Sequence, residues 1–373
     1  MKFVKLILLP ILFAPILSGC PANEQKVDLH YGSYAQNEIT TITQPELASK
    51  VDNKESFIAV VSPGHAGCMC WQDFKVILND YIKENHVIIY EISYNSFFDA
   101  SNNQLNTFGL EIRKEMETFA LFSKGELKTQ SVYSSSNSIF KQPSAFKEYL
   151  EDLISKPTMY FISLDQLTSI YQSGKEAVIY FARSNCPDCQ AVEVDFLREY
   201  TVSHREANKL YILDCETIGI REYDEEGHLT PESAARWQEF KNDYGLASVN
   251  NEQFGYTTGV VPTFQLIKGN GVSYSSSILS SSVYFNDSLS NEGGQVKIKE
   301  SFYSETRKGN LQYINNVETK VLEGMIVPET DYYTMTYGSN TYYIWKNECA
   351  ERYHSPLLSA FLDYALPQVT HSF

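Results

Sequence analysis

The feature that most constrains the fold is an internal duplication. Each half of the chain has the pattern of a strand, a helix that begins at a pair of cysteines, a second strand, another helix, a β-hairpin and a closing helix. The halves also share short sequences, because METFALFSKGELK at residues 116–128 corresponds to VPTFQLIKGNGVS at residues 261–273. Strands that alternate with helices predict sheets covered on both faces, so the expected fold class is α/β with two tandem domains.

The apolar residues place buried strands and amphipathic helices at matching positions in the two halves. Residues 56–62 and 177–182 are apolar, β-branched runs typical of buried strands. A helical pattern follows each run, over residues 70–85 and 189–203, with apolar side chains at intervals of three and four. These side chains are Phe74, Ile77, Leu78, Tyr81 and Ile82 in the first half and Val192, Phe196, Leu197 and Tyr200 in the second. We expect the link between the halves near residues 155–157.

The second half carries two motifs in a characteristic order. AVIYFARSNCPDC, residues 177–189, is a strand that leads into Cys-x-x-Cys at the start of a helix. GVVPTFQLIKGNG, residues 259–271, contains a strand that opens with Val261, Pro262 and Thr263. With both motifs at this distance, the second half resembles the thioredoxin-like thiol-disulfide oxidoreductases. The resemblance implies a central mixed sheet with helices on both faces, and a cis Pro262 beside the dithiol.

The chemistry expected of the dithiol follows from its place at a helix start. Unpaired backbone N–H groups and the positive end of the helix dipole stabilise a thiolate there, so we expect Cys186 to be an exposed nucleophile. Cys189, one turn further in, is expected to resolve the mixed disulfide, and the exchange needs no metal and no other cofactor. The resemblance implies that the backbone at Val261 and Pro262 binds an extended substrate. One departure is Tyr180, because the family's reductases usually carry an acid at this position.

The first half is a weaker copy of the same pattern. SPGHAGCMCW, residues 62–71, places Cys68 and Cys70 at the helix start with one residue between them instead of two. A disulfide across one residue closes a tight ring, so such a pair is expected to be a labile oxidant or shuffler. Glu117 stands where the second half has Pro262. Two interpretations are open: an auxiliary redox pair, or a decayed fold retained for packing or partner contact.

The N-terminus predicts export and lipid attachment. Lys2 and Lys5 precede an apolar run over residues 6–17, which is too short for a membrane-spanning helix and is typical of a secretory signal. The run ends in LSGC, which resembles a bacterial lipobox. That resemblance implies cleavage after Gly19 and attachment of acyl chains such as palmitate at Cys20. The alternative is an ordinary signal peptide that happens to end near a cysteine.

These features define the expected organisation of the chain. A mature portion of about 350 residues is too long for one small core and indicates two domains. The predicted parts are a lipoprotein signal peptide at 1–19, a polar tether at 20–38, a degenerate thioredoxin-like domain at 39–156, and a thioredoxin-like domain at 157–373 with an insertion at about 272–354. The insertion is rich in Ser, Asn and Tyr, so it is either a β-subdomain that selects clients or decoration.

Composition excludes some classes of function. The chain has 46 Asp plus Glu against 30 Lys plus Arg, and this acidic balance disfavours nucleic acid as a partner. Seven cysteines are too few for a disulfide-stapled scaffold of this length. Outside the lipobox and the two close pairs, Cys215 and Cys349 are expected to be packed thiols, with a disulfide between them as the alternative.

A metal site is a further alternative for the close cysteine pairs. Cys68, Cys70, Cys186 and Cys189 could together bind zinc or copper(I), and His65 could join the first pair. The two pairs lie over a hundred residues apart and lack a compact ligand spacing. We therefore expect no metal.

The function predicted from the sequence is thiol-disulfide exchange on protein cysteines by a lipid-anchored protein at the outer face of the bacterial cytoplasmic membrane. The expected partners are protein thiols or disulfides and a redox partner, with the membrane contacted through the anchor at Cys20. The main alternative is a non-catalytic thioredoxin-fold interaction or accessory lipoprotein in secretion or envelope assembly.

Overall fold

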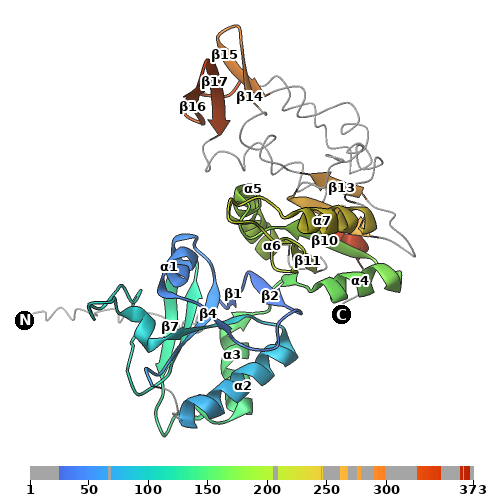
Figure 1. The fold of residues 1–373 in the computed structure, drawn as a ribbon. Helices are drawn as coiled ribbons and strands as arrows, with labels where there is room; N and C mark the ends of the chain where they lie inside the picture. The colour runs from blue at the N-terminus through green and yellow to red at the C-terminus, as the bar shows by residue number, and fades with distance from the viewer. Residues whose placement is uncertain are drawn as a thin grey trace, which may run out of the picture.

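The chain folds into two thioredoxin-like α/β units (Figure 1). The structure, a computed structural model, describes residues 25–65, 69–204, 209–244, 246, 261–267, 275–278, 289–298, 326–345, 362–363 and 365–369. No helix in these ranges is both long enough and apolar enough to cross a bilayer.

The first unit contains a five-stranded mixed sheet. Its strand order is β3-β5-β4-β6-β7, in which β3, β5 and β4 run parallel while β6 and β7 are antiparallel to their neighbours. The strands are β3 (Thr40–Thr41), β5 (Ile89–Ser93), β4 (Phe57–Ser62), β6 (Thr118–Ser123) and β7 (Glu126–Val132). This order, with the central strand followed by the cysteine-bearing helix, is the thioredoxin-type arrangement that the sequence predicts.

Helices cover both faces of the first sheet, which explains why its central strand is apolar throughout. Alternate residues of β4 point to opposite faces. Ile58 and Val60 join the cluster under α2 (Met69–Asn85) and α3 (Pro143–Leu153). The intervening residues Phe57, Ala59 and Val61 join a second cluster under α1 (Gln44–Asp52) and the 3₁₀ turn η1 (Tyr94–Phe97). A strand that is buried on both faces is apolar at every position, so its sequence does not alternate between apolar and polar residues.

The second unit repeats the strand order and adds one strand. Its sheet runs β13-β12-β10-β11-β9-β2, with β12 antiparallel to both β10 and β13 and the other pairs parallel. The strands are β13 (Ser275–Ile278), β12 (Thr263–Ile267), β10 (Ala177–Ala182), β11 (Leu210–Asp214), β9 (Met159–Phe161) and β2 (Tyr31–Ser33). Thus the sixth strand comes from the N-terminal segment, before the first unit begins.

The helices of the second unit include an interrupted one after the dithiol. The helices are α4 (Leu164–Ser173), α5 (Pro187–Val192), the π-helix η3 (Glu193–Leu197), α6 (Arg198–Ser203) and α7 (Pro231–Asp243). The sequence predicts one continuous helix over 189–203, and the structure has a single π-helical turn in its middle. Such turns are frequent at functional sites.

The N-terminal segment requires a correction to the predicted tether. Residues 27–33 are not a polar spacer, because β1 (Val27–Asp28) pairs with β8 (Ile154–Ser155) and β2 pairs with β9. Val27, Leu29 and His30 are each only 4 per cent exposed. These strands are two and three residues long, too short for a periodic pattern, and they form because exposed edges at β8 and β9 offer unpaired backbone groups.

The predicted insertion also differs in its bounds. β13 lies within the range 272–354, yet it pairs with β12 as the fifth strand of the thioredoxin-type order. Beyond it, the structure describes two hairpins and a terminal turn: β14 (Leu289–Glu292) with β15 (Gln295–Ile298), β16 (Tyr332–Tyr337) with β17 (Asn340–Trp345), and η8 (Leu366–Gln368). The closing helix of the second half, which the sequence pattern predicts over residues 355–366, begins outside the described residues.

A buried charge network joins the two units. Arg198 donates through Nη2 to Glu55 Oε1 at 3.2 Å and through Nη1 to the carbonyl oxygen of Asn53. Glu55 also accepts from Lys50 at 3.1 Å. Arg198 is 6 per cent exposed and Glu55 9 per cent, so this contact is shielded from solvent. The units therefore meet through a desolvated ion pair, which makes their relative placement dependent on both partners.

Candidate active site

The dithiol lies where the central strand of the second sheet gives way to a helix. β10 ends at Ala182, and Cys186 is the N-cap residue of α5, with Pro187 in the first turn. Proline is favoured there because its fixed φ suits a helix and its missing N–H would have no partner. Cys189 follows within the first turn of the helix. Both sulfur atoms therefore sit at the positive end of the helix dipole.

The register of the sheet brings Val261 to Cys186. β12 runs antiparallel to β10 with Thr263 opposite Phe181, so the residues before Thr263 lie beside the turn after β10. The Cys186 Sγ lies 3.9 Å from the carbonyl oxygen of Val261. The Val261–Pro262 bond is cis, which is the configuration implied by the resemblance.

The two sulfur atoms are less accessible than expected. Cys186 is only 8 per cent exposed, so the expectation of an exposed nucleophile is wrong. Cys189 is fully buried. Neither cysteine forms a disulfide. Burial and a side-chain hydrogen bond with Cys186 raise the pKa of Cys189 well above its ordinary range, whereas the backbone N–H of Arg183, 3.4 Å from its sulfur, opposes this shift. Cys189 is therefore a protonated thiol that needs a proton acceptor before it can attack.

A partly buried carboxylate, that of Glu193, lies close to the dithiol, and sequence reasoning missed it. The Tyr31 hydroxyl donates to Glu193 Oε2 at 2.9 Å. The Tyr180 hydroxyl lies 3.3 Å from Glu193 Oε1 and 3.4 Å from the carbonyl oxygen of Cys189. Burial raises the pKa of Glu193 to about 7, although these hydrogen bonds and the charge of Arg198 oppose the shift. An acid with this pKa can exchange protons near neutral pH.

Glu193 provides an acidic side chain near Cys189, whereas the resemblance places the acid at the position of Tyr180. Glu193 follows Cys189 by four residues, so one helical turn places both on the same side of the helix. Its negative charge is the smallest of the causes that raise the pKa of Cys189, after burial and the hydrogen bond with Cys186. The i, i+4 spacing was a signal available in the sequence. What the sequence could not show is that Tyr31, from the N-terminal strand, donates a hydrogen bond to this carboxylate.

The corresponding end of the first unit is built differently. Cys70 is disulfide-bonded, and Cys68 lies outside the described residues. Glu117 immediately precedes β6, as Pro262 precedes β12. It is fully buried, neither of its carboxylate oxygens has a hydrogen-bond partner among the described residues, and burial raises its pKa. Whether Cys68 and Cys70 form a redox pair remains a prediction.

Among the residues that the structure describes, the other candidates do not join the dithiol into a larger centre. Cys215 is a fully buried free thiol after β11, and burial raises its pKa far above the ordinary value. Cys20 and Cys349 lie outside the described residues. His65 faces Glu115 at 3.2 Å on an exposed surface. Within the described ranges, no group of three or more His, Cys, Asp and Glu side chains is arranged to hold a metal ion.

Comparisons with known proteins give distant structural similarity only. No known family matches the sequence, and no curated protein does. Among solved structures, form II of human ERp44 is 9% identical with a TM-score of 0.28, and the similarity covers 84% of this chain and 64% of that one. The bb fragment of ERp72 is 13% identical with a TM-score of 0.28, covering 66% of this chain and 93% of the fragment.

A third solved structure also shows this distant similarity. The first two thioredoxin domains of Naumovozyma dairenensis Eps1p are 12% identical with a TM-score of 0.21, covering 65% of this chain and 90% of that one. This chain spans about half to two thirds of the length of the human ERp44 structures, 50% in the zinc-bound form and 64% in form II. The fold class is assigned from the strand order of this protein itself. That order is the order of two tandem thioredoxin-like domains.

Proposed function

We propose that this protein is a thiol-disulfide oxidoreductase that acts on protein cysteines through Cys186 and Cys189. The observation that carries the proposal is the 3.9 Å contact between the Cys186 sulfur and the carbonyl oxygen of Val261. This contact places the Cys186 thiol, at a helix N-terminus, beside the backbone of Val261. An extended client can form main-chain hydrogen bonds with such a backbone segment.

In the reducing direction, the Cys186 thiolate attacks one sulfur of a client disulfide. A mixed disulfide forms between Cys186 and the client, and the other client sulfur leaves as a thiolate. Cys189 then loses its proton to Glu193, attacks the Cys186 sulfur and releases the second client thiolate. Two electrons pass from the enzyme dithiol to the client, and an external thiol donor must reduce the resulting Cys186–Cys189 disulfide. A client dithiol oxidised by the enzyme disulfide follows the same steps in reverse.

The proposed location is the outer face of the bacterial cytoplasmic membrane, with acyl chains on Cys20. The support is the charged start, the short apolar run and the LSGC sequence at residues 17–20. Several acyl chains on one cysteine would hold the protein firmly, whereas a single chain would hold it only marginally. The partners at this location are exported protein thiols or disulfides and a redox partner.

One observation favours the alternative, a non-catalytic interaction or accessory lipoprotein. Cys186 is 8 per cent exposed and Cys189 is buried, so a client disulfide reaches the nucleophile only along a narrow approach. A protein that keeps the fold for contact alone would have no need of an accessible sulfur.

Insulin reduction by the full chain distinguishes the two. Activity that is lost in Cys186→Ser and kept in Cys68→Ser supports the proposal. Wild-type protein that is folded, reduced and inactive would favour the non-catalytic role. Activity lost in Cys68→Ser and kept in Cys186→Ser would instead move the redox site to the first unit.

A further inference from the structure

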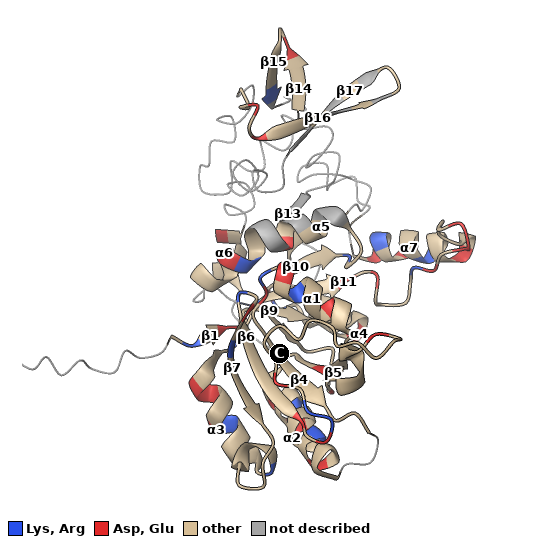
Figure 2. Ribbon diagram, turned by 90° about the vertical axis from the view of Figure 1, so that its left-hand side faces the viewer, with Lys and Arg blue, Asp and Glu red and all other residues tan. Residues whose placement is uncertain are grey.

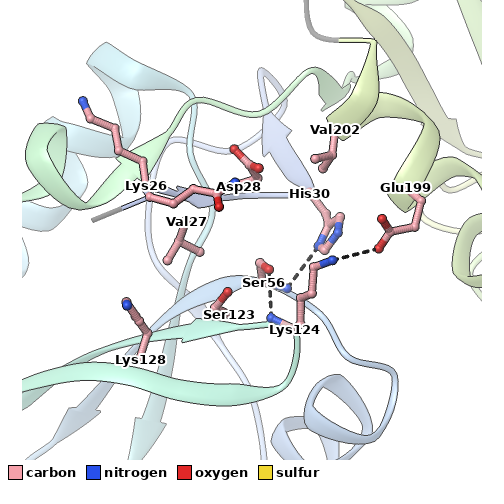
Figure 3. A pocket seen from close by; sticks show the side chains of 11 residues that line it. Lys26, Val27, Asp28, His30, Ser56, Ser123, Lys124, Lys128, Glu199 and Val202 are labelled. Carbon is pink, nitrogen blue, oxygen red and sulfur yellow. Dashed lines mark hydrogen bonds and ion pairs between the residues drawn. The ribbon is translucent and has the colours of Figure 1, made fainter. Parts of the chain in front are cut away.

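A pocket lies between the two units, against the N-terminal segment. Its cavity volume is about 320 Å³, at the lower end of the range for small-molecule sites. Its lining residues come from the N-terminal segment around β1, from Ser56 just before β4, from the hairpin between β6 and β7, and from α6 (Figure 3). Neither cysteine of the dithiol lines it, so it is separate from the proposed redox site.

The charge of this pocket differs from that of the rest of the protein. The chain carries a formal net charge of −16, yet Lys26, Lys124 and Lys128 all line this cavity. Basic residues accordingly lie beside β1 and β7 (Figure 2). Asp28 and Glu199 also line the pocket, which leaves the wall one positive charge in excess. A local positive site in an acidic protein indicates an anionic ligand.

The three lysines differ in the hydrogen bonds and ion pairs that they form with other residues. Lys124 pairs with Glu199 at 3.3 Å, but both side chains are 66% exposed, so an incoming anion can replace the carboxylate at little cost. Lys26 donates to the backbone carbonyl oxygen of Glu151, a contact that leaves its charge unneutralised. Lys128 makes no hydrogen bond or ion pair within the described part of the chain. Its charge is therefore available to a ligand.

Buried hydrogen-bond donors complete the pocket. His30 Nδ1 accepts the backbone N–H of Ser56 at 3.0 Å, so the ring proton resides on Nε2. Burial and the charges of Arg198 and Lys124 lower the pKa of His30 to about 4, which keeps the ring neutral. Ser56 Oγ accepts the N–H of Lys124 at 3.0 Å, which leaves its own hydroxyl hydrogen to donate. His30 is 4 per cent exposed and Ser56 7 per cent, and in the described residues neither donor has an acceptor.

We propose that this pocket binds the oxyanion of a phosphate group, held by Lys124 and Lys128 and oriented by the Nε2–H of His30 and the hydroxyl of Ser56. The source is either a phospholipid headgroup or free phosphate. Gln25 lines the pocket and lies five residues after Cys20, and an extended chain spans at most about 18 Å over that length. A headgroup as the source rests on the proposed lipid anchorage, whereas the oxyanion site itself does not.

Binding is tested with the full chain carrying Cys20→Ser, which has no acyl group. Titration with inorganic phosphate at low salt should show one site, and Lys124→Gln/Lys128→Gln should weaken it at least tenfold. Lys83→Gln, in α2 and outside the pocket, is the single-charge control and should bind as the parent does. Lys128→Gln alone, an exposed change, guards against misfolding of the double variant and should weaken binding severalfold. No binding by the parent protein, or equal binding by the double variant, would overturn the proposal.

Vesicle sedimentation identifies the source of the phosphate. Phosphatidylcholine vesicles report adsorption of the leader, and phosphatidylglycerol vesicles add an anionic headgroup. Stronger binding to phosphatidylglycerol that is lost in the double variant assigns the site to a headgroup. Phosphate binding with no difference between the vesicles assigns it to free phosphate. Insulin reduction by the same variants should stay at the parent level, so failure of the redox proposal would leave this test intact.

Discussion

The Tyr31 hydroxyl donates a hydrogen bond of 2.9 Å to Glu193, and these residues are 162 positions apart in the chain. Tyr31 belongs to the N-terminal strand β2, whereas Glu193 begins the π-helix behind the dithiol. The same interrupted helix is fixed to the first unit at its next turn, where Arg198 meets Glu55. The helix that carries Cys189 is therefore held by the N-terminal strand on one side and by the first unit on the other.

Glu193→Gln should slow resolution of the mixed disulfide. The carboxylate must be ionised to take the proton of Cys189, and its pKa is about 7, so the wild-type rate should rise with pH through that value. Glutamine cannot accept the proton, and loss of a general base typically costs a factor of about 100 or more. Single-turnover release of a thiol client between pH 5 and 9 measures this step. A variant with an unchanged profile would exclude Glu193 as the acceptor.

The same carboxylate should make folding stability depend on pH. The folded pKa of Glu193, about 7, lies above its ordinary value of 4.5, so the folded protein holds a proton that the unfolded chain has released. This stabilisation is complete below about pH 4.5 and is lost as pH rises through 7, and it amounts to at most about 3 kcal/mol. Urea unfolding across this range should show a steeper decline for wild type than for Glu193→Gln. Parallel curves would contradict the assignment.

Tyr31→Phe should shift the pH profile without removing it. The hydrogen bond from Tyr31 lowers the pKa of Glu193, so its loss should move the midpoint of the resolution rate to higher pH. The rate well above the midpoint should remain close to that of wild type. Tyr149→Phe is the matched control, because Tyr149 lies in the first unit with its hydroxyl near Ser131. A midpoint that stays in place in Tyr31→Phe would mean that the strand does not influence the acid.

Arg198→Met should destabilise the junction between the units. Removing one partner of a buried ion pair leaves Glu55 desolvated with only Lys50 beside it, and such losses cost about 3 kcal/mol or more. Lys124→Gln removes an exposed pair with Glu199 and should cost less than about 1 kcal/mol. Guanidinium unfolding of both variants gives the comparison. Equal losses would show that burial of Arg198 does not matter.

Much of the fold was predictable because its signals are local. The apolar runs at β4 and β10, the cysteines at the helix starts and the Val261–Pro262 pair each occupy a few consecutive residues, so they are visible without knowledge of tertiary contacts. The resemblance that these motifs carry then implies the central mixed sheet with helices on both faces. What remained hidden depends on distant partners.

Three features show why. Tyr31 lies in a three-residue strand whose pairing with β9 has no counterpart in local sequence. Glu193 looks like an ordinary charged helix residue, and it is mainly burial in the folded protein that raises its pKa. β13 has the sequence SSSI, which carries little strand propensity and is held by its register with β12. In each case long-range pairing, and not the segment itself, decides the structure.

The most direct test of the central claim is a trap for the mixed disulfide. Cys189→Ser leaves the attacking sulfur of Cys186 in place and removes the thiol that resolves the adduct. We expect disulfide-linked client adducts to accumulate with this variant, to disappear on reduction, and to be absent from Cys186→Ser/Cys189→Ser. Adducts that persist in the double variant, or none in the single variant with its Cys186 thiol shown to be reduced, would contradict the assignment of Cys186 as the nucleophile.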